Sequence, residues 1–270
     1  MELSINYSPQ AARLVEEGKI FVERFKCPPW SGMIAAALAL RPVAVHFDLD
    51  AGNRNLDNVD WEQIEDLLEE TDTPYVNLHL APSPEYHPGV PLDTPAGPAF
   101  DQVAESMLMD VQAVVARFGP ERVIVENVPY RASQGNVLRP AAEPQVIQRV
   151  LEETDAGLLL DISHARIAAH YLGIEAKEYC SRLPVHRLRE LHFTGLHQVE
   201  GKLQDHLSIL ESDWPMLAWV LEKIRAESWG SPWMLAFEYG GVGEIFSWRS
   251  DPQVMLEQVP KLYEMVKDVA

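Results

Sequence analysis

The stretch Gly157-Leu158-Leu159-Leu160-Asp161-Ile162-Ser163-His164 joins an apolar run to a polar turn. Uninterrupted leucines are typical of a strand that is buried on both faces, as in a parallel sheet covered by helices. The run ends at the carboxylate of Asp161, and the imidazole of His164 follows three residues later. Because parallel α/β enzymes carry their active sites at the C-terminal ends of strands, this stretch predicts both a strand and a place for chemistry.

The same pattern recurs along the chain. Short apolar runs rich in β-branched residues alternate with longer runs of helical spacing, which predicts successive parallel βα units. A buried helical stripe, for example, is predicted from Phe100, Val103, Met107, Val111 and Val114. Eight strands are predicted, over residues 2–6, 20–25, 43–47, 75–80, 122–126, 157–161, 189–193 and 233–238.

Eight such units predict a (β/α)8 TIM barrel, an α/β fold. No Gly/Ser linker or charge block divides the 270 residues, so 1–270 is expected to be a single domain. A doubly wound open sheet is the alternative, although neither GxGxxG nor GxxxxGK[ST] occurs. The Pro-rich stretch 81–98 is expected to be a long rim loop or lid, and Asp213 is expected to cap a helix that has Pro215 in its first turn.

The composition disfavours several classes of protein. With 41 acidic and 22 basic residues the formal charge is −19, which works against binding to nucleic acid. The longest apolar run, Met33 to Leu40, is far shorter than the roughly 20 residues that span a bilayer, so no membrane association is expected. No secretory signal is visible, which favours a cytoplasmic location. Cys27 and Cys180 lack CxxC spacing and are expected to be free thiols.

Six of the eight predicted strands end in a residue that can bind a metal ion. His164 joins this set through its spacing from Asp161, and Asp205-His206 follows His192 after thirteen positions, in what is predicted to be a separate loop. The candidate metal ligands are His46, His79, Glu126, Asp161, His164, His192, Asp205, His206 and Glu238.

So many carboxylates and imidazoles at one barrel mouth predict a multinuclear centre of about two or three divalent ions, since crowded like charges are otherwise unfavourable. Nitrogen and oxygen ligands suit iron, zinc or manganese. Singly, each residue has a simpler interpretation, because a histidine in an apolar strand is often a hydrogen-bonded core residue and a carboxylate at a strand end often caps a helix. The prediction therefore depends on the whole set.

Several other polar residues have weaker interpretations. Asn127 is a candidate catalytic residue that orients a substrate or bound oxygen, or else it hydrogen-bonds the next loop. Glu190 faces inward by strand alternation and has no assigned role. Tyr7, Lys26 and Trp30 follow the first two predicted strands, where they would either line the pocket or, as we expect, have surface or packing roles. Contact with solvent is expected for His87 and His197.

In chain order, the candidate ligands resemble those of the xylose-isomerase-like barrel superfamily, particularly its trinuclear endonuclease IV branch. The specific parts are the Asp161-x-x-His164 pair and the thirteen-residue step from His192 to Asp205. That branch has a D-x-H motif where this chain has Asp205 and His206 adjacent. The resemblance therefore supports His206 less than it supports the other ligands.

A closer resemblance is to the multinuclear non-haem iron oxidase family, long catalogued only as a domain of unknown function, which includes the methanobactin-biosynthesis oxidase. The matching segments are Val45-His46, Leu78-His79-Leu80, Glu126-Asn127, Leu158 to Asp161, Glu190-Leu191-His192, Asp205-His206 and Leu235 to Glu238. This resemblance implies two or three irons that use dioxygen to modify cysteine residues of a peptide, often with a partner protein that presents the peptide. The loop 239–243 departs from the family's usual acidic ending.

The sequence leaves four functions open. An iron-dependent oxidase that modifies a peptide or small molecule is favoured. An endonuclease IV-like hydrolase or phosphodiesterase is the second, and the excess of acids opposes it. A sugar isomerase or epimerase is the third; such enzymes usually use a lysine, and Lys26 is the only one near a predicted strand end. A non-catalytic metal-binding or partner-binding barrel is the fourth.

Overall fold

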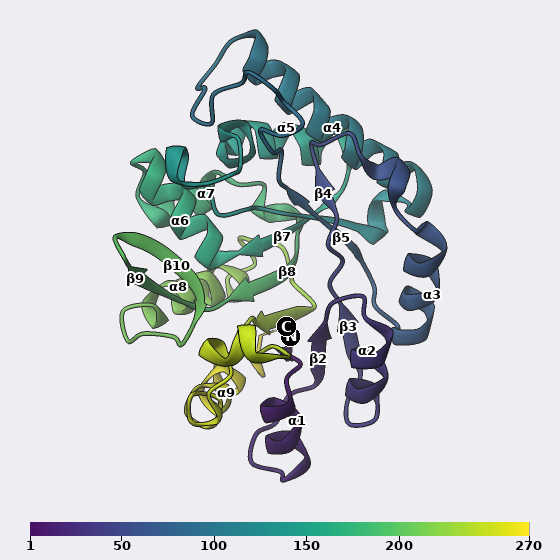
Figure 1. Cartoon of the computed structure of the whole chain (residues 1–270). Helices are drawn as coiled ribbons and strands as arrows, with labels where there is room; N and C mark the ends of the chain where they lie inside the picture. Colours follow the sequence, from purple (N-terminus) through teal and green to yellow (C-terminus); the bar gives the residue numbers. More distant parts are fainter. Residues whose placement is uncertain (270) are drawn as a thin grey trace. The chain divides into compact units, whose positions relative to one another are not determined.

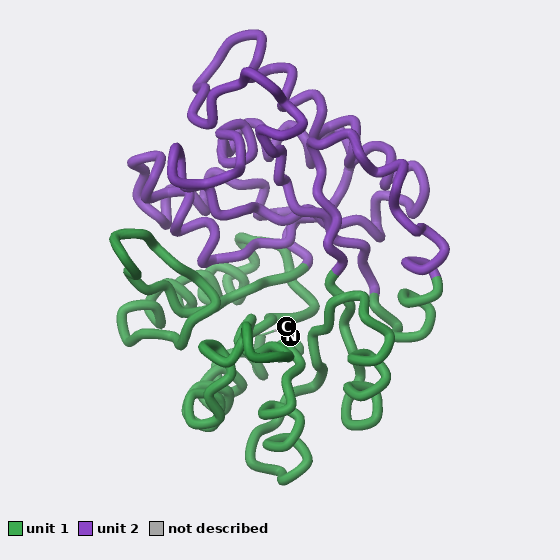
Figure 2. The backbone as a smooth tube through the Cα atoms, in the orientation of Figure 1, with its two compact units in different colours: residues 1–46, 66–73, 190–270 green, residues 47–65, 74–189 purple. Residues whose placement is uncertain are grey.

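The structure, a computed structural model, describes residues 1–269 (Figure 1). The chain divides into two compact units, which Figure 2 shows in different colours. Unit 1 contains residues 1–46, 66–73 and 190–270, and unit 2 contains residues 47–65 and 74–189. Each unit contains parallel strands and the helices that follow them, so the predicted α/β class is confirmed. Closure of eight βα units into one barrel, and the single domain, stay predictions.

Unit 1 contains parallel strands in the order β3-β2-β1-β11-β8. Leu3, Phe25, Phe193 and Phe237 are fully buried in these strands, as expected for a sheet covered on both faces. The strands are β1 (Glu2–Asn6), β2 (Arg24–Cys27), β3 (Val43–Val45), β8 (Leu188–Phe193, in unit 1 from Glu190) and β11 (Met234–Phe237). The helices are α1 (Pro9–Glu16), α2 (Ser31–Leu38), α8 (Trp214–Arg225) and α9 (Pro252–Val266).

Unit 2 contains parallel strands in the order β7-β6-β5-β4. Leu78, Val125 and Leu159 are fully buried in its sheet. The strands are β4 (Asp50–Ala51), β5 (Val76–Leu80), β6 (Val123–Glu126) and β7 (Gly157–Asp161). The helices are α4 (Pro98–Phe118), α5 (Pro144–Thr154), α6 (Ile162–Leu172) and α7 (Ala176–Arg182), together with the start of α3 (Trp61–Thr71).

A strand lies in each of the eight predicted regions, and β1 and β7 have the predicted bounds. The second strand was misplaced, since residues 20–25 were predicted and β2 spans Arg24–Cys27. Ile20 and Val22 are buried in the connection before β2, so their apolar character reflects packing of a turn. The prediction that Asp205-His206 lies in a loop was also wrong. Both residues belong to β10 (Lys202–Leu207), which pairs antiparallel with β9 (Gly195–Val199) in a ribbon of its own (Figure 1).

Two predicted loop features have clear outcomes. The Pro-rich segment is a long loop that ends at Gly97, where φ is +96° and α4 begins at Pro98. Asp213 precedes α8 as predicted, but its carboxylate does not cap that helix. It accepts the backbone N–H groups of Leu196 and Leu210 instead, at 3.3 and 2.8 Å, and so ties the β9–β10 ribbon to the start of the helix.

Both cysteines are buried free thiols, as predicted. Within residues 1–269, no helix has the length and apolar character needed to span a bilayer.

Candidate metal centre

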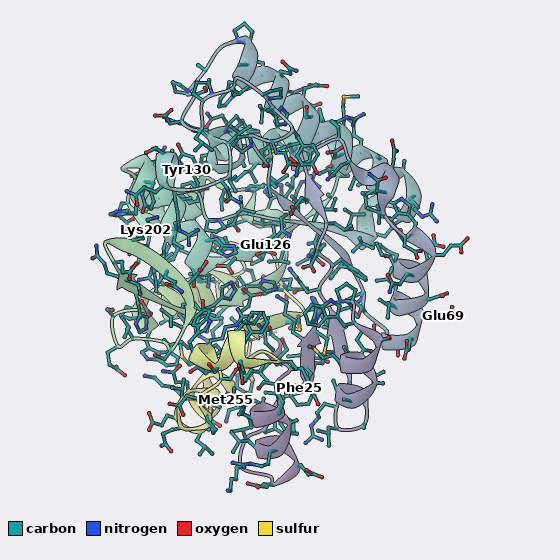
Figure 3. All side chains as sticks on the ribbon, viewed as in Figure 1. Phe25, Glu69, Glu126, Tyr130, Lys202 and Met255 are labelled. Carbon is teal, nitrogen blue, oxygen red and sulfur yellow. The ribbon has the colours of Figure 1, made fainter. Side chains whose placement is uncertain are left out.

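In unit 2, Glu126 is the residue on which the other candidate ligands converge. It ends β6, is 1% exposed, and is labelled in Figure 3. One carboxylate oxygen lies 3.2 Å from Nε2 of His79, and the other lies 3.2 Å from Nδ1 of His164. His79 is paired with Glu126 in the register of β5 and β6. The parallel sheet therefore brings two ligand types together that are far apart in sequence.

The spacing of Asp161 and His164 follows from helix geometry. Asp161 is the N-cap of α6, and its Oδ1 accepts the backbone N–H of His164 at 2.7 Å. This is the usual reach of a capping side chain to the third residue of a helix. The cap holds the imidazole next to the same carboxylate, with Nδ1 of His164 3.6 Å from Oδ2 of Asp161. The D-x-x-H pair thus combines a helix cap with two candidate ligands.

Asn127 fixes the geometry of this pair. Its side-chain amide donates to the backbone carbonyl of Asp161 at 2.9 Å and accepts the backbone N–H of Asp161 at 3.0 Å. The Asn127 carbonyl lies 3.0 Å from Nδ1 of His164. Of the two interpretations of Asn127, a hydrogen-bonding role is observed, although its partner Asp161 ends β7 and does not lie in a loop. Its catalytic role stays a prediction.

His79 lies between two acids. Nδ1 of His79 is 3.5 Å from Oδ1 of Asp50, and the opposite nitrogen faces Glu126. Burial acts to lower the pKa of His79, but the charges and hydrogen bonds of Glu126 and Asp50 outweigh it and raise the pKa to about 10. Because only a neutral imidazole binds a metal ion, loading His79 with metal would release a proton.

In unit 1, His192 is held from both sides of its ring. Nε2 lies 2.8 Å from Oε1 of Glu190, while Nδ1 lies 3.3 Å from Oε1 of Glu238. Trp233 donates from Nε1 to the other oxygen of Glu190 at 2.9 Å. A histidine ligand typically donates its second N–H to a carboxylate, which fixes its tautomer and orientation. The inward position of Glu190, which had no assigned role, is explained by this contact.

Lys26 is the largest departure from expectation in unit 1. A surface or packing role was favoured over a position in the pocket; the side chain is buried, and its ammonium forms an ion pair with Glu238. The same ammonium lies 3.4 Å from Nδ1 of His192. A buried charge is normally paired, and Lys26 pairs with a candidate metal ligand. Its partner directly follows β11, more than 200 positions away, which no local pattern could indicate.

Of the remaining candidates of unit 1, His206 and His46 lie near Glu238 and His192. Nδ1 of His206 is 3.6 Å from Oε2 of Glu238, and the rings of His46 and His192 are 5.3 Å apart. Asp205 is buried. The register of β9 and β10 shifts between Gln204 and Leu207, and His206 has φ of +59°. This irregularity turns the backbone so that the adjacent Asp205 and His206 do not simply alternate across the ribbon.

Two histidines were expected to face solvent; the structure corrects this for His87, while His197 is partly exposed. His87 is buried, and its Nε2 lies 2.6 Å from the carbonyl of Gly52 in unit 2. His197 is half-buried, with Nε2 2.7 Å from the carbonyl of Ser208 in unit 1. In each case a loop carbonyl needs a donor, which a sequence pattern does not show.

The side chains of unit 2 fit a metal ion by their chemistry. Glu126, Asp161 and His164 each offer a ligand atom, and these atoms lie within 4.8 Å of one another. Two carboxylates and an imidazole suit iron, manganese or zinc, as the ligand types predicted. In the described residues the acidic and histidine groups that could hold metal are therefore present, while the identity and number of ions stay predictions.

Solved structures show what the fold resembles. The chain is similar to D-allulose 3-epimerase from Methylomonas sp., with a TM-score of 0.60, 14% identity, and coverage of 98% of this chain and 96% of that one. It is also similar to a xylose isomerase-like TIM barrel/4-hydroxyphenylpyruvate dioxygenase fusion protein, with a TM-score of 0.55 and 13% identity over 100% of this chain and 45% of that one. At these identities the likeness concerns the fold alone.

Relatives in sequence and a family model identify the family of the chain. A UPF0276 protein of Acaryochloris marina is 28% identical over 202 residues, which is 70% of this chain and 67% of that protein. A UPF0276 protein of Pseudomonas aeruginosa is 33% identical over 100 residues, which is 36% of this chain and 34% of that protein. The matches thus span about a third to two thirds of these relatives. The family model that describes the RiPP precursor modification enzymes MbnB/TglH/ChrH matches residues 32–229. That match covers most of the chain, which therefore belongs to the MbnB/TglH/ChrH family of RiPP precursor modification enzymes.

Proposed function

We propose that this chain is a metal-dependent oxidase that uses iron and dioxygen to modify a peptide, which a partner protein presents. The observation that carries the proposal is the contact of Glu126 with His79 and His164, next to Asp161. Three ligand atoms this close suit a cation. The family supplies the substrate class, a precursor peptide.

The protein's own groups would prepare the site. When bound, iron would supply redox chemistry with dioxygen. The capping bond from Asp161 to the backbone of His164 and the two bonds from Asn127 to the backbone of Asp161 hold two donors in place before any ion binds. Such preorganisation is what a metal site needs for tight binding. Asp50 lies next to Nδ1 of His79, so that Nε2 faces Glu126.

The test is to load the full chain with ferrous iron without oxygen, measure bound metal, and then add air with cysteine-containing peptides. We expect bound iron, oxygen consumption that depends on peptide, and a mass change in the peptide. Glu126→Gln should lower the bound iron and abolish the oxygen consumption and the mass change. The matched control is Glu143→Gln, because Glu143 is also a buried carboxylate of unit 2 but is paired with Arg139 instead of a histidine.

A second candidate follows from the fold alone, since the solved neighbour from Methylomonas sp. is a sugar epimerase. The same preparation should therefore be offered D-allulose and D-fructose with manganese. Epimerisation that Glu126→Gln abolishes, with no peptide modified in the iron-loaded sample, would replace the oxidase by this candidate. Cleavage of abasic DNA would favour a phosphodiesterase, which the net charge of −19 opposes.

A further inference from the structure

Arg249 is a half-buried cation in unit 1, at the end of the 3-10 segment Glu244–Arg249 that follows β11. Its guanidinium lies over the ring of Phe246, 4.5 Å from the centroid, and 5.6 Å from the centroid of Trp248. Burial lowers the pKa of Arg249, while the charges of Glu238 and Asp205 act to raise it. The guanidinium is therefore within electrostatic range of two candidate metal ligands.

This guanidinium lacks the partners that a buried arginine normally has. Within residues 1–269, Nε of Arg249 is buried without a hydrogen-bond partner, and the side chain forms no ion pair. A buried donor left unsatisfied costs about 1–3 kcal/mol, and a charged one costs more. An arginine offers a planar fork that matches a carboxylate through two parallel hydrogen bonds. Because Nε itself is covered while the residue is only half-buried, an anion supplied by a ligand would meet the outer, Nη edge of this fork.

The segment that carries Arg249 is anchored to the rest of unit 1. The hydroxyl of Ser250 donates to the Phe246 carbonyl at 3.0 Å, and the hydroxyl of Tyr239 accepts the backbone N–H of Asp251 at 3.3 Å. Phe246 packs so closely on Gly241 that a Cβ there would lie 2.6 Å from the Phe246 side chain. The ring under the guanidinium therefore packs directly against the backbone of Gly241.

The same segment also exposes apolar side chains. Ile245 is 74% exposed, Trp248 is 45% exposed, and Val242 is 38% exposed. Large exposed apolar groups that share a segment with a cation are typical of a surface that contacts a ligand. A peptide offers both kinds of partner, because it carries apolar side chains and carboxylates on one chain.

We propose that Arg249 binds a carboxylate of the substrate, with Trp248 and Ile245 contacting the apolar groups beside it. The inference rests on the proposed function, which makes the substrate a peptide. The carboxylate is that of a peptide C-terminus or of an aspartate or glutamate side chain, since the fork recognises both. In a chain with a net charge of −19, an acidic ligand needs a local cation of this kind.

The test uses the full chain labelled with ¹⁵N and three small probes. N-acetylalanine carries a terminal carboxylate, N-acetylaspartate α-methylamide carries a side-chain carboxylate, and N-acetylalanine methylamide carries none. We expect at least one acid to shift the Arg249 Nε–H signal, with an affinity that falls by about 10-fold or more in Arg249→Gln, or about 1.4 kcal/mol. The acid that binds more tightly identifies the source. The neutral amide should not bind.

Two further variants keep the result interpretable. Arg249→Lys retains charge without the fork and should bind the acid with intermediate affinity. Arg117→Gln is the matched control, because Arg117 also lies over aromatic rings but already pairs with Glu65. Its removal should leave acid binding unchanged. Equal acid binding by the wild type and Arg249→Gln, or no acid binding at all, would overturn the proposal.

The outcome is separable from that of the proposed function, because the probe experiment needs neither metal nor turnover. If the acids bind at Arg249 but the chain holds no iron, the oxidase proposal fails alone. If iron-dependent peptide modification occurs and Arg249→Gln leaves KM for the modified peptide unchanged, the present inference fails alone. A rise in KM with kcat retained would support it.

Discussion

The two units balance their candidate metal ligands in different ways. In unit 2 the carboxylate of Glu126 contacts the imidazoles of His79 and His164. In unit 1 the carboxylate of Glu238 contacts the ammonium of Lys26 as well as the imidazole of His192. A neutral imidazole can bind a metal ion, whereas a protonated lysine has no lone pair to offer one. Both units therefore contain imidazoles that suit a metal ion, and unit 1 adds the positive charge of the buried Lys26 beside its candidate ligand Glu238.

The largest effect is expected when the ammonium of Lys26 is removed. In chelated protein, Lys26→Met should lower the free energy of unfolding by about 3–5 kcal/mol, because Glu238 is left buried without its ammonium partner. Urea denaturation measures this change. Lys261→Met is the control, since Lys261 forms an exposed ion pair with Glu211 that should contribute at most about 1 kcal/mol. Equal losses in the two variants would show that Lys26 has no special role in unit 1.

The next effect concerns unit 2, where the carboxylate of Glu126 contacts two imidazoles. Glu126→Gln should weaken metal binding by about 100-fold or more, or about 2.8 kcal/mol, because it removes the charged group shared by His79 and His164. Competition with a chelator of known affinity measures the change. If Lys26→Met reduces metal binding as much as Glu126→Gln does, the distinction between the units is wrong.

A smaller effect is expected from Glu190, which contacts Nε2 of His192 and is not itself a candidate ligand. Glu190→Gln should reduce metal affinity by roughly 10- to 100-fold and shift the ¹⁵N signals of His192 toward the other tautomer, since the amide can donate to Nε2. The control is Asp213→Asn, another buried carboxylate of unit 1, which bonds only backbone N–H groups in the contacts described above. It should lower stability and leave the His192 tautomer unchanged. An unaltered tautomer in Glu190→Gln would contradict the positioning role.

The smallest effect compares the opening of the two units through their cysteines. Burial raises the pKa of Cys27, in unit 1, and of Cys180, in unit 2, from 9.0 to about 12. The fold thus favours the neutral thiols, so stability is unaffected below pH 9 and falls as pH rises from there toward 12. At pH 8 both thiols should resist iodoacetamide until denaturant is added. The cysteine that mass spectrometry finds alkylated first identifies the unit that opens more easily, and rapid alkylation without denaturant would contradict their burial.

Much of the fold follows from local periodicity. The leucines of β7 and the acid that ends them specify a strand and its end within a few residues, and the bounds match. Ile20 and Val22 misled because apolar residues in a packed turn resemble a strand. The two residues of β4 are too few to show any period, and the β9–β10 ribbon alternates irregularly where its register shifts.

The candidate site, like the fold, could be predicted only where the signal is local in the sequence. Ligand types at strand ends could be predicted because each is marked by its own strand, as Glu126 and Asp161 are. The partners of those candidate ligands could not be predicted. Lys26 and Glu238, for example, are 212 positions apart and are brought together by the pairing of β2 with β1 and of β1 with β11. Arg249 was missed for another reason, because it follows a strand end by a turn that has no regular repeat.

The cap at the start of α6 has a consequence for how this motif tolerates change. Asp161 holds His164 through a bond that spans one helical turn. Inserting one residue between them would rotate the imidazole by about 100° around the helix axis, away from the strand ends. The two positions in between are constrained by packing, but the length of the segment is constrained by geometry. Deletions and insertions here should therefore displace the His164 imidazole from Asp161, even where substitutions of Ile162 or Ser163 are accepted.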